Sequence, residues 1–145
     1  PKPIENSTMS MLTALKISSS AMNAQMMRLN TTASNLANID VVGSTSEEAY
    51  KAKKPIFKTV IENYTQDNFG ASVSVNGIFV SDRENTSRYD PQNPLASKDG
   101  YVFMSNVNSI EEMVDMTNAS RSYQTNVEVM NATKKMMMST LQLGK

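Results

Sequence analysis

The longest regular pattern of the sequence lies in residues 8–38. Apolar or small residues recur there at alternating spacings of three and four, at Leu12, Leu15, Ser19, Met22, Met26, Leu29, Ala33 and Leu36. This spacing predicts a helix whose seam packs against other helices. The rest of the segment is rich in Ser, Thr and Asn and carries only two charges, Lys16 and Arg28. A solvated helix normally has a charged outer face, so we expect the face away from the seam to meet protein instead of water.

A second seam of the same kind lies near the C-terminus. It consists of Met113, Met116, Ser120, Tyr123, Val127, Met130, Lys134, Met137 and Leu141. Ser109, followed three residues later by Glu112, predicts a capping box at the start of this helix. Acidic residues lie in its first turns and Lys134 and Lys135 lie near its end, as the helix macrodipole favours. Gly144 is typical of a helix stop.

The pattern between the two helices is that of short strands. Residues 50–62 and 101–104 predict extended chain, and residues 72–80 alternate around Asn76 and Gly77. This pair favours a two-residue hairpin, although one strand with a glycine bulge fits nearly as well. Residues 90–94 contain two prolines, which predict irregular chain. The sequence thus predicts an α+β fold with an N-terminal axial helix in residues 1–40, a β-rich outer insert in 41–106 and a C-terminal axial helix in 107–145.

The composition of the N-terminal helix opposes helix formation. Fourteen of the 32 residues from 7 to 38 are Ser, Thr or Asn, and each costs roughly 0.5 kcal/mol relative to alanine in a helix. A lone helix of this composition is largely unfolded in water. We therefore predict that both terminal segments are disordered in the monomer and fold on assembly, as the two helices pair into a coiled-coil-like element.

Composition excludes several classes of function. The 14 basic and 14 acidic residues cancel, and the chain contains no histidine and no cysteine. Nothing in the charge balance favours nucleic acid, and histidine chemistry, cysteine nucleophiles, disulfides and the usual zinc sites are excluded. No apolar run reaches the roughly 18 residues of a membrane span. The first apolar stretch is interrupted by Ser and Thr, so we expect no cleaved signal peptide.

Three candidate sites have simpler structural interpretations. Twelve methionines could bind Cu(I) through their thioethers, but half of them lie on the seams, where methionine fills irregular gaps. The acidic pairs at residues 47–48 and 111–112 have no nucleophile or base beside them. The lysines of residues 51–58 suit a solvated strand edge, and the N-terminal helix has too few basic residues for a membrane surface. We expect no cofactor, no metal, no catalysis and no membrane insertion.

Residues 34–40 form the most specific string of the sequence, Ser-Asn-Leu-Ala-Asn-Ile-Asp. A helix end explains Asn38 as a left-handed cap, but it does not explain Asn35. An amide one turn earlier, beside the seam residue Leu36, would hydrogen-bond more naturally to a neighbouring helix.

This string resembles that of bacterial flagellar axial proteins, and two further regions narrow the resemblance to the proximal-rod subunits of the FlgC type. The matching stretches lie in residues 21–38, 50–53, 89–102, 112–128 and 141–144. They cover most of the chain outside residues 1–14 and 41–49. The first is shared by rod and hook proteins generally, whereas the later ones favour the proximal-rod family.

The resemblance implies a structural role. It implies helices paired in an inner tube, an outward β-rich insert, export through the flagellar type III apparatus, and a rod in the periplasm that carries torque from the basal ring toward the hook. The expected partners are identical subunits, other rod proteins, the export apparatus and the basal ring. Another rod or hook protein, or a soluble helical adaptor or secreted effector, remains an alternative.

The seams and the specific string together predict which residues form the assembly interface. They are Leu12, Leu15, Met22, Met26, Leu29, Asn35, Leu36, Asn38, Met113, Met116, Tyr123, Val127, Met130, Met137 and Leu141.

Overall fold

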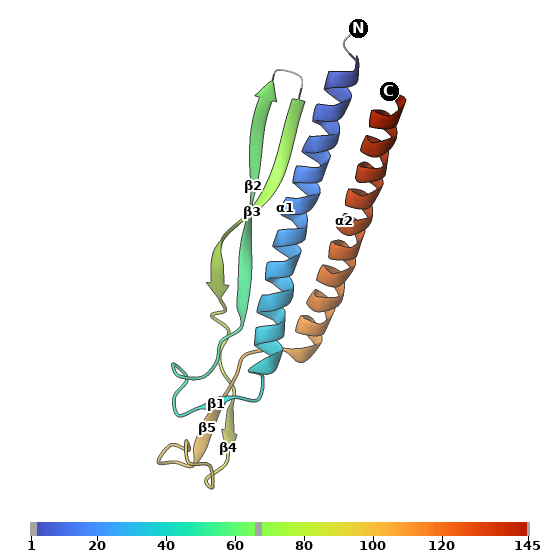
Figure 1. Cartoon of the computed structure of the whole chain (residues 1–145). Coiled ribbons are helices and arrows are strands. Elements are labelled where there is room, and N and C mark those ends of the chain that lie inside the picture. The colour runs from blue at the N-terminus through green and yellow to red at the C-terminus, as the bar shows by residue number, and fades with distance from the viewer. Residues whose placement is uncertain (1–2, 66–67, 145) are drawn as a thin grey trace. The chain divides into compact units, whose positions relative to one another are not determined.

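The computed structural model describes residues 3–65 and 68–144 and contains two long helices with strands between them (Figure 1). The elements are α1 Pro3–Ala37, β1 Val42–Gly43, β2 Lys53–Thr65, β3 Asn68–Val80, β4 Ser87–Tyr89, β5 Tyr101–Met104 and α2 Ser109–Leu143. The predicted α+β fold, with N- and C-terminal helices around a β-rich insert, is confirmed. The division into residues 1–40, 41–106 and 107–145 as separate functional segments stays a prediction.

The strands form two antiparallel arrangements. β2 and β3 pair with each other, and β5 is the central strand of a three-stranded sheet with the order β1-β5-β4. Gly43 lies opposite Phe103 on one side of β5, and Ser87 lies opposite the same residue on the other side. The edge strands β1 and β4 have two and three residues. Such short edges offer little template for aberrant strand pairing.

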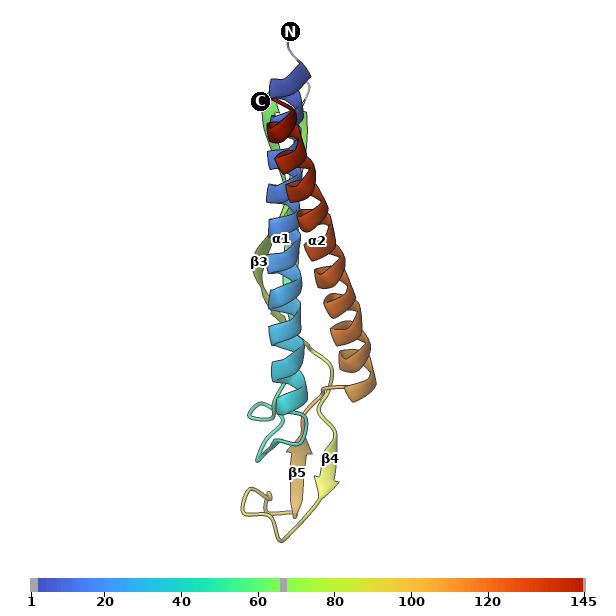
Figure 2. The same cartoon turned by 45° about the vertical axis from the view of Figure 1, so that its right-hand side comes forward.

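The chain forms two compact units. The first, which we call the helix–ribbon unit, contains the described residues up to Met27, those of Phe57–Asn76, and those from Ala119 onward. Within this unit α1 lies between the β2–β3 ribbon and α2 (Figures 1 and 2). The backbone N–H of Val73 in β3 donates a hydrogen bond to the Ser20 hydroxyl of α1, at 3.2 Å. The ribbon therefore covers part of the polar face of α1.

The second unit, which we call the sheet unit, contains Arg28–Ile56 and Gly77–Asn118. It includes the sheet β1-β5-β4 and the ends of both helices that adjoin the insert. Its buried apolar residues are small: Val102 is fully buried, and Ala49 and Ala52 are nearly so. Buried polar side chains accompany them, among them Asn35 and Asn106. This unit is therefore held together by hydrogen bonds as much as by apolar packing.

The strand predictions are confirmed at β5 and for most of β2, and the proline-containing residues 90–94 are turn and bend. The two-residue hairpin at Asn76 and Gly77 is wrong, because β3 runs through both as one strand. Gly77 has φ 136°, a conformation that glycine adopts without steric cost. The single-strand alternative accounts for this segment.

Both predicted caps require correction. The N-terminal cap of α2 is Asn108, not Ser109: its Oδ1 accepts hydrogen bonds from the N–H groups of Ile110 and Glu111, and its carbonyl accepts that of Glu112. Asn is as good an N-cap as Ser. Asn38 is not a left-handed cap, because no described residue other than glycine has a positive φ. Its backbone N–H continues the helical bonding to the Ser34 carbonyl, and its side chain donates to the same oxygen.

Candidate assembly interface

Asn35 joins the end of α1 to the chain that enters β2. Its Oδ1 accepts hydrogen bonds from the Lys53 N–H and the Tyr50 hydroxyl, both at 3.0 Å, and its Nδ2 donates to the Lys53 carbonyl at 2.8 Å. The side chain is fully buried. The prediction that this amide bonds to a neighbouring helix is therefore wrong, because it bonds to backbone and tyrosine of its own unit.

Two more asparagines hold the same stretch of chain, and sequence reasoning missed both. Asn106 accepts a hydrogen bond from the Ala52 N–H at 2.6 Å and donates to the carbonyls of Ser81 and Arg83. Asn85 donates to the carbonyls of Tyr50 and Met104. We call Asn35, Asn85 and Asn106 the asparagine clamp. The hydrogen bonds of the clamp join residues that are 15 to 54 positions apart, so no local sequence pattern predicts them.

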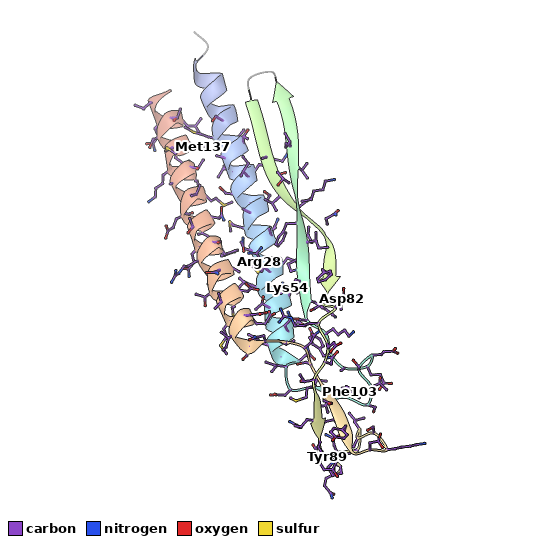
Figure 3. The ribbon with its side chains drawn as sticks, turned by 180° about the vertical axis from the view of Figure 1, so that it is seen from behind. Arg28, Lys54, Asp82, Tyr89, Phe103 and Met137 are labelled. Carbon is purple, nitrogen blue, oxygen red and sulfur yellow. The ribbon has the colours of Figure 1, made fainter. Side chains whose placement is uncertain are left out.

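A charged cleft of about 200 Å³ lies in the sheet unit. Its lining residues are Arg28, Thr32, Lys53, Lys54, Pro55, Glu112 and Asp115, and Figure 3 labels Arg28 on α1 and Lys54 on β2. Lys54 pairs with Asp115 at 3.4 Å, with both side chains about half exposed. Exposed pairs of this kind contribute little stability. With opposite charges paired, the cleft is best explained as a junction between α1, β2 and α2.

The predicted seam of α1 is not the face that the chain itself buries. Leu12 and Met26 are 55% and 43% exposed, and the other predicted apolar interface residues of this helix are half-buried, as is Asn38. They are Leu15, Met22, Leu29 and Leu36. The buried residues of α1 are instead small or polar: Ser18, Ala24, Thr31, Thr32 and Asn35. Part of the polar face of α1 is therefore covered by its own chain, and the apolar seam stays partly accessible.

The buried face of α2 is shifted relative to the predicted seam. Its buried residues are Glu112, Ala119 and Thr133. Five predicted interface residues are half-buried, namely Met116, Tyr123, Val127, Met130 and Met137. Met113 and Leu141 are 58% and 59% exposed. The predicted seam consists of two rows, each with residues seven positions apart. The buried row of Glu112, Ala119 and Thr133 lies one position nearer the N-terminus than the predicted row that contains Met113 and Leu141, and these two side chains are therefore exposed.

Within the helix–ribbon unit, α1 and α2 form an apolar groove of about 550 Å³. Eight residues line it: Leu15, Lys16, Ser19, Met130, Lys134, Met137, Met138 and Leu141. Four of them belong to the predicted interface, and Figure 3 marks Met137 on α2. The structure thus brings Leu15, Met130, Met137 and Leu141 together. Exposed methionines suit a surface that must fit a neighbouring helix.

The described residues also bear on metal binding and on membrane spanning. No group of three or more acidic or other metal-ligating side chains is placed to hold a metal ion. Across the same residues, neither helix combines the length and hydropathy that a membrane span needs.

Comparison with known proteins supplies independent information. Residues 98–143 match the family described as flagellar basal body rod FlgEFG protein C-terminal, and residues 15–44 match the flagella basal body rod protein family. The chain is 43% identical over 136 residues to the flagellar basal-body rod protein FlgC of Escherichia coli O6:H1, covering 94% of this chain and 99% of the relative. FlgC of Salmonella typhimurium is 42% identical over the same coverage. FlgC of Bacillus subtilis is 35% identical over 145 residues, covering 91% of this chain and 97% of the relative.

Proposed function

Since this chain belongs to the FlgC family of flagellar basal-body rod proteins and is a structural subunit of the proximal rod, we propose that it polymerises through its terminal helices with identical and related rod subunits. In this way it carries motor torque toward the hook. The proposal includes no catalytic step and no cofactor.

The observation that carries the proposal is the distribution of apolar side chains. The buried hydrophobic residues of the described chain are four alanines and Val102. Large apolar side chains on both helices are instead more than one-third exposed, among them Leu12, Met26, Met113, Met138 and Leu141. Exposed apolar surface of this extent marks sites of protein contact. Neighbouring subunits would supply the packing that the single chain lacks.

The finer partners and location follow from the same proposal. We place the subunit in the periplasmic part of the rod, in contact with other rod proteins and the basal ring. It would arrive through the flagellar type III export apparatus. A chain without cysteine, whose helices have low intrinsic propensity, suits passage in an unfolded state.

A deletion strain tests the proposal. Cells that lack the gene for this chain should be non-motile and should yield basal bodies without a complete rod in electron micrographs. A plasmid copy should restore both swimming and the rod. Motile deletion cells with complete hooks would refute the structural role.

A further inference from the structure

Strand β3 contains the pair Asn76 and Gly77, which does not form the predicted hairpin and which the proposed assembly does not use. Asparagine is one of the chemically labile residues of proteins. Its loss begins when the backbone nitrogen of the following residue attacks the side-chain amide carbon. Glycine in the following position hinders this attack least, because it has no Cβ. The pair is therefore well suited by its sequence to react.

The structure leaves this pair open to solvent. Asn76 and Gly77 are both exposed. Gly77 has φ 136°, which departs from regular strand geometry and which glycine adopts without steric cost. A Cβ built at this position would meet no atom within 4 Å. Nothing packs against the backbone of Gly77 on this side, so water, which the reaction consumes, has access to the pair.

A second pair that could form the same ring, Asp99 and Gly100, lies in a different environment. Gly100 is buried, and its N–H donates a hydrogen bond to the Ser97 carbonyl at 2.9 Å. A Cβ at Gly100 would lie 2.8 Å from the ring of Tyr89. Attack by the Gly100 nitrogen must first break a hydrogen bond in a tightly packed turn, which costs free energy. The fold therefore protects this pair, whereas it leaves Gly77 open.

The asparagine clamp gives the same contrast. Asn35, Asn85 and Asn106 each donate a hydrogen bond from the side-chain amide to a backbone carbonyl, and none of the three is followed by glycine. Loss of these amides would break bonds that hold the sheet unit. The exposed amide of Asn76 has no such role in the clamp, so its chemistry is free to differ.

We propose that Asn76 is a site of spontaneous covalent modification, at which the exposed pair deamidates in the folded protein. The Gly77 nitrogen loses its proton and bonds to Cγ of Asn76, the Cγ–Nδ2 bond breaks, and the amide nitrogen leaves as ammonia. Water then adds to one of the two carbonyl carbons of the five-membered imide and opens the ring, yielding aspartate or isoaspartate. The reaction consumes one water molecule and needs no oxidant, reductant or enzyme.

The modification alters β3 in two ways. Either product adds a negative charge to the strand, and isoaspartate also moves a side-chain methylene into the main chain. An added backbone atom disturbs the alternation of side chains between the two faces of a strand. The reaction requires only this chain and water. It is therefore independent of the proposed rod function, and either proposal can fail without the other.

A matched comparison within one molecule tests the proposal. The variant Asp99→Asn carries two Asn-Gly pairs, one exposed in β3 and one buried at its glycine. The purified full-length variant is incubated in mildly alkaline buffer and digested. Mass spectrometry with peptide fragmentation then locates the mass increase, which is the difference between water and ammonia. We expect the amide at position 76 to react at least about tenfold faster than the amide introduced at position 99.

The same measurement in concentrated urea removes the two environments and gives the intrinsic rates. There we expect the two positions to react at rates that agree within about threefold, because only the neighbouring residues still differ. A folded-state difference no larger than the difference in urea overturns the proposal, since the fold would then discriminate nothing.

The wild-type chain provides an independent readout. When half of a synthetic peptide of residues 72–80 has reacted, we expect more than about one-tenth of the folded chain to carry the modification at position 76. A smaller fraction overturns the proposal, because strand β3 would then protect the pair. Asn76→Gln is the matched control: it keeps an amide but would require a larger ring, and position 76 should stay unmodified. Asn76→Asp supplies the reference peptide that separates the aspartate product from isoaspartate.

Discussion

The two units of this protein differ in how their buried groups are held. In the sheet unit, the asparagine clamp satisfies buried backbone groups over long sequence separations within one chain. In the helix–ribbon unit, the buried hydrophobic residues among those described are Ala24 and Ala119, whereas large apolar side chains such as Leu12, Met138 and Leu141 are exposed. The hydrogen bonds that hold the sheet unit lie within one chain, and we propose that neighbouring subunits complete the helix–ribbon unit.

This difference suits the assembly that we propose for this subunit. Hydrogen bonds to buried backbone groups contribute only about 1 kcal/mol each, but they fix geometry strongly because an unpaired group is costly. Exposed apolar side chains contribute to stability only when another surface removes them from water. We therefore expect the sheet unit to have a defined geometry before assembly and the helix–ribbon unit to gain most of its stability during assembly.

The largest expected effect comes from placing a charge in the groove. Leu15→Asp should abolish swimming, because a carboxylate in an apolar subunit contact is desolvated without a partner of matching geometry. Asn23→Asp, at an exposed position of the same helix, serves as the control and should swim normally. Swim-ring diameter and isolation of basal bodies measure the effect, and normal rods in the Leu15→Asp strain would contradict the assembly role of the groove.

Removal of the first clamp residue should destabilise the sheet unit. Asn35→Ala leaves the N–H and carbonyl of Lys53 without their partner and should lower the free energy of unfolding by about 2–4 kcal/mol. Urea titration followed by tyrosine fluorescence measures it, since three of the five tyrosines lie in this unit. Asn30→Ala, at an exposed position of α1, is the matched control. Equal stability of the two variants would show that the clamp is dispensable.

The two units should differ in amide hydrogen exchange when the chain is a dilute monomer. We expect the parts of α1 and α2 in the helix–ribbon unit to exchange about a hundredfold faster than residues 28–37 and 109–118, a difference of about 2.8 kcal/mol. The reason is that neighbours are absent for the first set, whereas the clamp acts on the second. Full helicity by circular dichroism and uniform protection would contradict folding on assembly.

Gly43 tests the tight packing of the loop between β1 and β2. A Cβ at this position would lie 2.7 Å from the backbone nitrogen of Ala49, so Gly43→Ala should cost about 1–3 kcal/mol through a forced backbone shift. Gly144→Ala is the control, because its Cβ would meet the nearest carbonyl oxygens at 3.7 Å. Thermal unfolding compares the two, and a wild-type midpoint for Gly43→Ala would mean that the loop adjusts freely.

The smallest effect should come from the ion pairs of the sheet unit. Arg83→Ala removes a pair with Glu111 at 3.2 Å, but both side chains are about half exposed, so we expect less than about 1 kcal/mol. Lys98→Ala, at an exposed loop position, controls for the loss of one positive charge. A loss as large as that of Asn35→Ala would mean that charge, not the amide clamp, holds this unit together.

Local sequence pattern determined the two long helices and the strands of residues 53–62 and 101–104, because these depend on residues at most a few positions apart. Leu12 and Met26 of the predicted α1 seam are exposed in the single chain, and their role in assembly stays a prediction. Part of the polar face of α1 is covered by the chain itself, where the Val73 N–H bonds to the Ser20 hydroxyl. The identity of the cover could not be predicted, because Val73 and Lys53 reach α1 from 53 and 18 residues away.

The tertiary structure alone decided that Asn35 serves its own unit and that the buried row of α2 is shifted by one position. Each of these choices depends on which backbone group or helix comes near in space, and helical periodicity carries no such information. The sequence by itself therefore predicted assembly through the terminal helices, and the fold decided which faces of those helices stay exposed.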